Sequence, residues 1–210
     1  MAFEPLTPER RRAMTRRHLL EAAAIVFARD GFHGATLDDV AATAGFTKGA
    51  VYSNFKSKDD LFLALLDDRI DRQFAITSEI LESGSHDPSE ELPRVRTMLR
   101  GGAFFSDPSW NTLYLEFVLY SRRNPEAAEK LAASSQRIHA WVRDLIETAH
   151  RDAGVLPKFD FDHLAEISLA LFDGLAHHRM IDPTSVTEAT IDTVLSFLYE
   201  MMDGEVAPPA

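Results

Sequence analysis

The chain has no cysteine, and none of its apolar runs approaches the roughly 18 to 20 residues that a membrane-spanning helix needs. The missing thiols exclude a disulfide framework, a zinc finger and a cysteine nucleophile. Residues Met1 to Arg12 contain no apolar stretch followed by a small-residue cleavage site, so no secretory signal is predicted. We therefore expect a cytoplasmic protein without a membrane partner.

Signals for β-strands are also scarce, because no segment alternates apolar and polar residues as a half-buried strand would. Signals for helix starts recur instead: a capping residue followed by proline or an acid. About nine helices are expected, beginning near Thr7, Thr36, Thr47, Ser57, Glu90, Pro108, Asn124, Asp160 and Ser185. Asp30-Gly31 should end the first helix and Gly45 the second. The sequence thus predicts an all-α fold.

Net charge is unevenly distributed along the chain. The whole chain carries −11, which by itself argues against a nucleic-acid partner. Residues 1–58, however, hold nine Lys/Arg and six Asp/Glu, a balance of +3, and the remaining residues carry −14. This asymmetry favours a basic head that meets a polyanion and an acidic body that does not. We expect a head over residues 1–57, a body over 58–204 and a disordered tail over 205–210.

A helix-turn-helix is the sharpest motif in the head. Two short helices in TLDDVAATAGFTKGAVYSNF, which begins at Thr36, flank a turn at Gly45. Val40, Ala41 and Ala44 of the first helix and Ala50 and Val51 of the second are placed to face inward. Small Ala41 lets the helices cross closely. This geometry puts a second helix into the DNA major groove. Its outward residues suit contacts to bases and phosphates, whereas Thr36 and Lys58 begin helices that could clamp phosphates on either side.

The segment GFHGATLDDVAATAGFTKGAVYSNFKSKDDLF, with its Tyr52, Phe55 and Lys58, resembles the DNA-binding domain of TetR-type transcriptional regulators over about residues 15–65. The resemblance implies a homodimer, an operator with two-fold symmetry and a ligand-binding body. We expect no cofactor. It makes Phe55 a core residue. With the outward residue Ser53 added, the expected DNA contacts are Thr36, Thr47, Lys48, Gly49, Tyr52, Ser53, Asn54 and Lys58.

Five arginines lie on or just before the first helix: Arg10, Arg11, Arg12, Arg16 and Arg17. Two interpretations stay open at this point. They form an arm that reaches phosphates or the minor groove, or they are a solvated helix start, as charged runs usually are.

Aromatic residues gather in the middle of the body, where helical spacing fits either core packing or an apolar pocket for a small molecule. Glu116 in LYLEFVLY needs a partner if it is buried: Arg122, Arg96 or a ligand. The expected effector is small and apolar or aromatic. The expected ligand-binding residues are Phe62, Met98, Phe105, Trp110, Tyr114, Glu116, Phe117, Trp141 and Phe172.

The last two helices carry apolar stripes that could form a four-helix interface between two protomers, or pack only within one. Gly174 inside a helix costs about 1 kcal/mol relative to alanine, which close helix packing would offset. The expected interface residues are Leu164, Ile167, Leu171, Gly174, Leu175, Ile191, Val194, Leu195 and Leu198.

Catalytic chemistry has little support in the sequence. Two pairs have metal-ligand spacing, Asp173 with His177 and His163 with Glu166, but no third ligand follows, so no metal site is expected. The chain has no GxSxG elbow, glycine-rich phosphate loop or HExxH motif, so we expect no enzyme. A helical interaction module without DNA would leave Lys48 and Tyr52 unexplained. The leading hypothesis is a ligand-responsive DNA-binding regulator, a repressor released from a palindromic operator by its effector.

Overall fold

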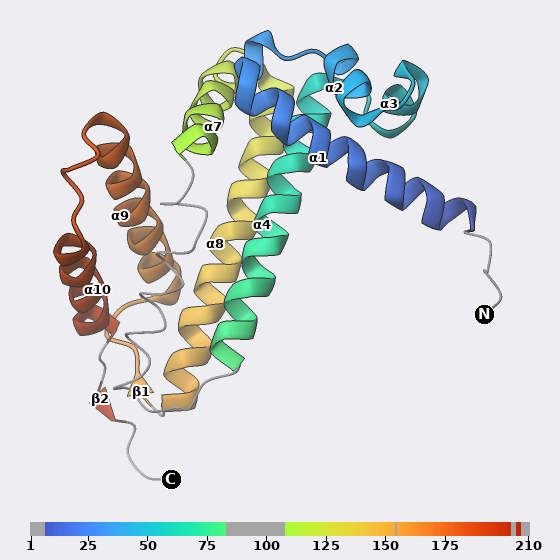
Figure 1. The fold of residues 1–210 in the computed structure, drawn as a ribbon. Helices are drawn as coiled ribbons and strands as arrows, with labels where there is room; N and C mark the ends of the chain where they lie inside the picture. Colours follow the sequence, from blue (N-terminus) through green and yellow to red (C-terminus); the bar gives the residue numbers. More distant parts are fainter. Residues whose placement is uncertain (1–6, 83–107, 154, 203–204, 207–210) are drawn as a thin grey trace. The chain divides into compact units, whose positions relative to one another are not determined.

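A computed structural model describes residues 7–82, 108–153, 155–202 and 205–206, and the chain divides into two compact units. The first contains residues 1–69 and 112–131, and the second contains 70–111 and 132–210. Eight helices and two very short strands lie in the described ranges, which confirms the all-α class (Figure 1). The helix expected from Glu90 lies outside them.

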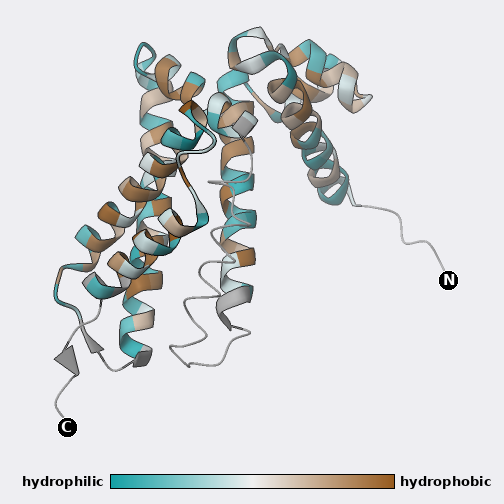
Figure 2. Ribbon diagram, turned by 60° about the vertical axis from the view of Figure 1, so that its left-hand side comes forward, coloured by the Kyte–Doolittle hydropathy of each residue, from teal (hydrophilic) through white to brown (hydrophobic). Residues whose placement is uncertain are grey.

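The first unit begins with α1 (Pro8–Gly34), α2 (Leu37–Ala44), α3 (Lys48–Asn54) and the first half of α4 (Lys58–Glu82). The predicted caps form: the Thr7 hydroxyl accepts the Arg10 N–H at 3.2 Å, and Pro8 takes the first helical position. Helical geometry breaks at Gly31, as expected, but one further turn follows to Gly34. The first turns of α1 are mainly hydrophilic and its middle is apolar (Figure 2).

Most of α7 (Pro108–Ser121) and the first turns of α8 (Pro125–Ala153) also belong to the first unit. The expected boundary at residue 57 therefore differs from the structural division, and the reason is aromatic packing. Phe117 of α7 stacks on Phe62 of α4 with ring centroids 4.2 Å apart, and it meets Phe32 of α1 edge-on at 5.0 Å. All three rings are essentially inaccessible to solvent, so α7 is part of the core of the first unit, hereafter called the head.

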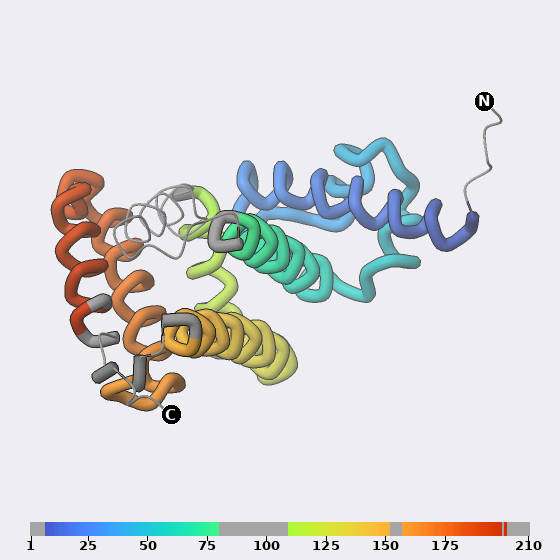
Figure 3. The backbone as a smooth tube through the Cα atoms, turned by 90° about the horizontal axis from the view of Figure 1, so that it is seen from below, coloured from blue at the N-terminus to red at the C-terminus, as the bar shows by residue number. Residues whose placement is uncertain are grey.

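The second unit contains the rest of α4 and α8, with α9 (Phe161–Ile181) and α10 (Glu188–Met202) side by side (Figures 1 and 3). The Asp160 carboxylate caps α9 as the sequence predicts, accepting the N–H groups of Asp162 and His163.

A two-residue antiparallel pairing was not expected from the sequence. Strand β1 (Val155–Leu156) pairs with β2 (Glu205–Val206). The first two residues of the expected tail, Glu205 and Val206, thus pair with the segment between α8 and α9. The remaining tail residues, 207–210, lie outside the described ranges.

Candidate functional site

Local signals position the helix-turn-helix in the first unit. The Thr36 hydroxyl caps α2 by accepting the Asp39 N–H at 3.1 Å, and the Thr47 hydroxyl caps α3 through the Ala50 N–H at 3.3 Å. Between the helices Gly45 adopts φ +70°, a left-handed conformation that suits glycine. Val40, Ala41 and Val51 are buried, as predicted, and hold the two helices together. Ala44 and Ala50, also expected to face inward, are only half-buried.

The outward face of α3 is polar. Lys48, Gly49, Tyr52 and Ser53 are exposed, as is the cap residue Thr47. Asn54 is half-buried and its amide donates to the Ala50 carbonyl at 2.8 Å, a carbonyl that also accepts the Ser53 hydroxyl at 2.9 Å. Tyr52 is 58% exposed, although large aromatic side chains usually bury most of their surface. An outward aromatic ring among small polar residues is a surface suited to contact with a partner.

An ion pair lies beside this face. The Lys48 ammonium group donates to the Asp38 carboxylate of α2, and this contact raises the pKa of Lys48. Lys48 therefore carries its positive charge at neutral pH, but one of its three donors is engaged by an acid of the same protein.

Lys58 differs from its expected role. Its ammonium group donates to the carbonyls of His33 and Ala35, both at 3.1 Å, and lies over the Phe32 ring at 4.8 Å. Partial burial lowers the pKa of Lys58. The side chain thus caps the carboxyl end of α1 instead of projecting from the start of α4. The Thr36 hydroxyl is likewise used locally, since it also donates to the Asp39 carboxylate at 2.5 Å.

Two arginines of α1 contact the carboxyl end of α3, a structural role that was not predicted from the sequence. The Arg12 guanidinium donates to the Ser53 carbonyl and the Arg16 guanidinium to the Asn54 carbonyl, both at 3.4 Å. Arg16 also lies over the ring of buried Phe55 at 4.5 Å. The arginine run is visible in the sequence, but nothing local indicates which of its members reach α3.

Three of the expected ligand-binding residues belong to the head. Phe62 and Phe117 are fully buried in its aromatic core. Glu116 has neither of the arginine partners considered from the sequence; its carboxylate accepts the backbone N–H of Phe32 at 2.6 Å. The positive φ at Gly31 presents this N–H to α7, so the three residues join α7 to α1.

The other expected ligand-binding residues have varied surroundings. Met98 and Phe105 lie outside the described ranges, and Trp110 and Tyr114 are half-buried. In the second unit Trp141 of α8 stacks on Phe74 of α4, with centroids 4.2 Å apart and planes within 10°. Phe172 packs on an apolar cluster around Ile191. Phe74 was not among the expected ligand-binding residues, although it lies on the apolar face of its helix.

The expected interface residues divide into two sets. Leu164, Ile191, Leu195 and Leu198 are buried within a single protomer. Leu164 packs with Ile146 of α8, which is the within-protomer alternative considered above. The other members are exposed or half-buried, namely Ile167, Leu171, Gly174, Leu175 and Val194. Phe197 of α10 is 51% exposed and was not in the expected set.

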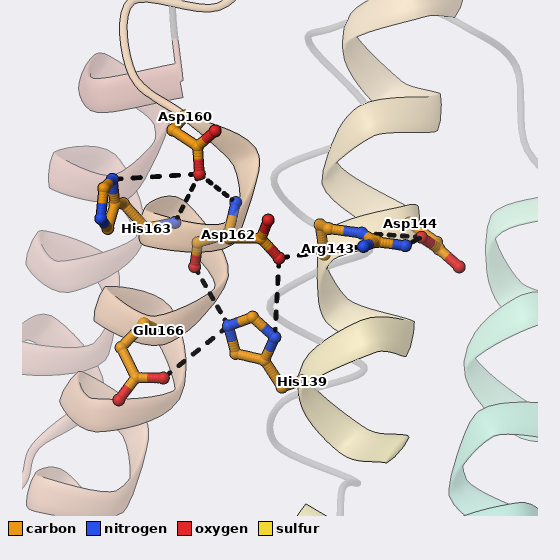
Figure 4. A network of polar contacts seen from close by, with 7 residues as sticks. All are labelled: His139, Arg143, Asp144, Asp160, Asp162, His163 and Glu166. Carbon is orange, nitrogen blue, oxygen red and sulfur yellow. Dashed lines mark hydrogen bonds and ion pairs between the residues drawn. The ribbon is translucent and has the colours of Figure 1, made fainter. Parts of the chain in front are cut away.

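A polar network links α8 to α9 in the second unit (Figure 4). His139 of α8 lies between Asp162 and Glu166 of α9, with its Nε2 atom 3.7 Å from a Glu166 carboxylate oxygen. His163, which has metal-ligand spacing with Glu166, instead lies 3.9 Å from Asp160. The His177 ring contacts the Asp173 carbonyl of its own helix at 2.7 Å. In the described parts of the chain, no three such side chains converge as ligands of a metal ion would.

Among the residues that the structure describes, none of the helices combines the length and the apolar character needed to cross a membrane.

Comparison with known proteins relates both parts of the chain to regulators. Residues 19–65 match the family "Bacterial regulatory proteins, tetR family", and residues 94–202 match "BetI-type transcriptional repressor, C-terminal". The HTH-type transcriptional regulator YdgC of Bacillus subtilis is 24% identical over 185 residues, which cover 86% of this chain and 91% of YdgC. The repressor AcnR of Corynebacterium diphtheriae is 28% identical over 53% of this chain and 62% of AcnR.

Solved structures share the fold. GusR of Salmonella enterica superposes with a TM-score of 0.69 at 22% identity, covering 95% of this chain and 99% of GusR. A protein from Saccharomonospora viridis, solved in complex with choline, has a TM-score of 0.67 at 24% identity and covers 92% of this chain and 99% of its own. The capped helix-turn-helix, the second helical unit and the two family matches together establish that the chain belongs to the TetR family of ligand-responsive, DNA-binding transcriptional regulators.

Proposed function

We propose that the chain is a homodimeric repressor that acts in the cytoplasm and places α3 of each protomer in the major groove of a palindromic operator. The observation that carries the proposal is the outward face of α3, where exposed Tyr52 stands among small polar residues on a helix capped by Thr47 and preceded by the capped helix α2. Two such helices must lie about 34–36 Å apart to enter successive grooves. A dimer supplies that spacing, and light scattering should give twice the 23.5 kDa chain mass.

Effector binding in the C-terminal part releases the operator by changing the spacing of the two α3 helices. A typical coupling of about 1–3 kcal/mol changes affinity 5- to 150-fold. We infer a small apolar or aromatic effector, supported by the half-buried rings of Trp110, Trp141 and Phe172. The chain has only two tryptophans, Trp110 and Trp141, so effector binding is expected to change intrinsic fluorescence. Choline, the ligand of the Saccharomonospora viridis protein, is a useful competitor in that titration.

Replacing Tyr52 by alanine is expected to weaken operator binding at least about tenfold, because the ring and its hydroxyl leave the surface that enters the groove. Since Tyr52 is 58% exposed, the change should alter the free energy of unfolding by no more than about 0.5 kcal/mol. Fluorescence anisotropy with the DNA upstream of the chain's own gene measures the effect. Leu119→Ala on α7, where the side chain is 69% exposed, is the control. Full affinity of the Tyr52 variant, or no binding by the unchanged protein at low salt, contradicts the proposal.

Asp38→Asn is expected to tighten binding to any duplex roughly two- to fivefold, the range for an exposed charge pair. The change releases the Lys48 ammonium group from its acid partner and removes a negative charge beside α3. Anisotropy titrations at one salt concentration test this. In a Lys48→Ala background the gain should shrink, because only the charge removal is left. Unchanged or weaker binding by Asp38→Asn in the otherwise natural chain would show that Lys48 makes no DNA contact.

A further inference from the structure

The amino-terminal turns of α1 present arginines next to the end of α3. Arg12 and Arg16 are four residues apart and therefore lie on one face of α1. Their guanidinium groups donate to the carbonyls of Ser53 and Asn54, the last two residues of α3. The same segment contains Arg17, which pairs instead with Glu21 of its own helix at 3.3 Å. The structure thus separates two arginines that bond to α3 from one that pairs with an acid of α1.

The contacts to α3 orient these two guanidinium groups but engage only some of their hydrogen-bond donors. The contacts to α3 occupy one N–H of each at 3.4 Å, whereas a guanidinium carries five donors in a fixed planar arrangement. Arg16 is further held by the Phe55 ring, 4.5 Å away. Both side chains belong to exposed residues. A pair of positioned, exposed guanidinium groups matches the geometry of a phosphate, which Arg can bind through two parallel hydrogen bonds.

The length of α3 indicates where that phosphate lies. A helix of seven residues spans about 10 Å, and the major groove is about 12 Å wide. When α3 lies in the groove, its end is therefore within reach of the sugar-phosphate strand at the groove edge. Arg12 and Arg16 contact this same end of α3.

We propose that Arg12 and Arg16 form a binding site for DNA backbone phosphates at the edge of the groove that α3 enters. The inference rests on the proposed operator binding by α3 and assigns to α1 a second, sequence-independent contact. Such contacts set the register of a protein on DNA and give affinity without selecting bases. They also release counterions, so they appear in the salt dependence of binding.

The test compares the double variant Arg12→Gln/Arg16→Gln with Arg17→Gln/Arg29→Gln. The control removes the same charge from the same helix, but from arginines that pair with Glu21 and Asp30. Affinity for the operator and for an unrelated duplex is measured by anisotropy at several salt concentrations. For the test variant, the slope of log affinity against log salt should decrease by about 1 per lost phosphate contact, and both duplexes should weaken by the same factor. The control should keep a slope close to that of the unchanged protein.

A second variant, Arg12→Lys/Arg16→Lys, keeps both charges and should restore most of the slope. This result distinguishes phosphate binding from a purely structural support of α3. An unchanged slope in the glutamine variant, with a loss confined to the operator, would mean that the arginines only support α3 and would overturn the inference. Equal slopes for the test and control variants would overturn it as well. Failure of the unchanged protein to bind either duplex would instead contradict the proposed function itself.

Discussion

Phe117→Ala is expected to lower the free energy of unfolding by about 3–5 kcal/mol, the usual cost of removing a buried aromatic ring. Phe117 is completely inaccessible to solvent, stacks on Phe62 and meets Phe32 edge-on. Its removal leaves a cavity at the point where α1, α4 and α7 meet. Because these helices also support the helix-turn-helix, operator affinity at 37 °C should fall with stability.

Urea unfolding followed by circular dichroism measures this loss, at one protein concentration because dimerisation contributes to apparent stability. Leu119→Ala is the matched control, since it lies two residues further along α7 and is 69% exposed. It should change stability by no more than about 0.5 kcal/mol. Equal effects of the two variants would mean that α7 does not belong to the core of the head.

Gly31→Ala is expected to destabilise the protein by about 3 kcal/mol or more, through two separate causes. Gly31 has φ +69° and ψ 176°, a region that is almost restricted to glycine and costs other residues about 1–3 kcal/mol. A Cβ atom there would also lie 2.8 Å from a Glu116 carboxylate oxygen. The carboxylate would have to leave the Phe32 N–H, and a hydrogen bond to a charged group contributes about 1.5–3 kcal/mol.

A double-mutant cycle with Glu116→Ala separates the two causes. In that background the collision and the hydrogen bond are already absent, so Gly31→Ala should cost only the backbone strain. Gly34→Ala is the control, because a Cβ at Gly34 meets its nearest atom at an ordinary 3.5 Å and no positive φ is required. Strict additivity in the cycle would show that Gly31 and Glu116 act independently.

Much of the head could be predicted from sequence, because the signals that define it are local. Thr7, Thr36 and Thr47 cap the helices that they were expected to cap, through bonds to N–H groups three residues away. Gly45 ends α2 by adopting positive φ within a single residue. Such interactions depend only on neighbours in the chain, so the residue pattern specifies them.

The partners of charged and aromatic side chains could not be predicted in the same way. Glu116 meets a backbone N–H 84 residues away, and the Lys58 ammonium group lies on carbonyls at the end of α1. An aromatic residue at helical spacing fits a core or a pocket equally well, and only packing placed Phe62 and Phe117 in the core of the head while Trp141 stacks on Phe74. The residues expected at a protomer interface also fit either an interface or the core of one protomer. Leu164 packs inside one protomer.

The sequence by itself determined the helical class, the helix-turn-helix and its outward face, since capping, turn formation and helical periodicity act over a few residues. Only the tertiary structure decided that α7 joins the head, that Lys58 serves α1, and that Arg12 and Arg16 face the end of α3. Each of these contacts joins segments more than twenty residues apart, so local residue patterns do not specify it. Such segments come together only when the tertiary fold buries apolar surface.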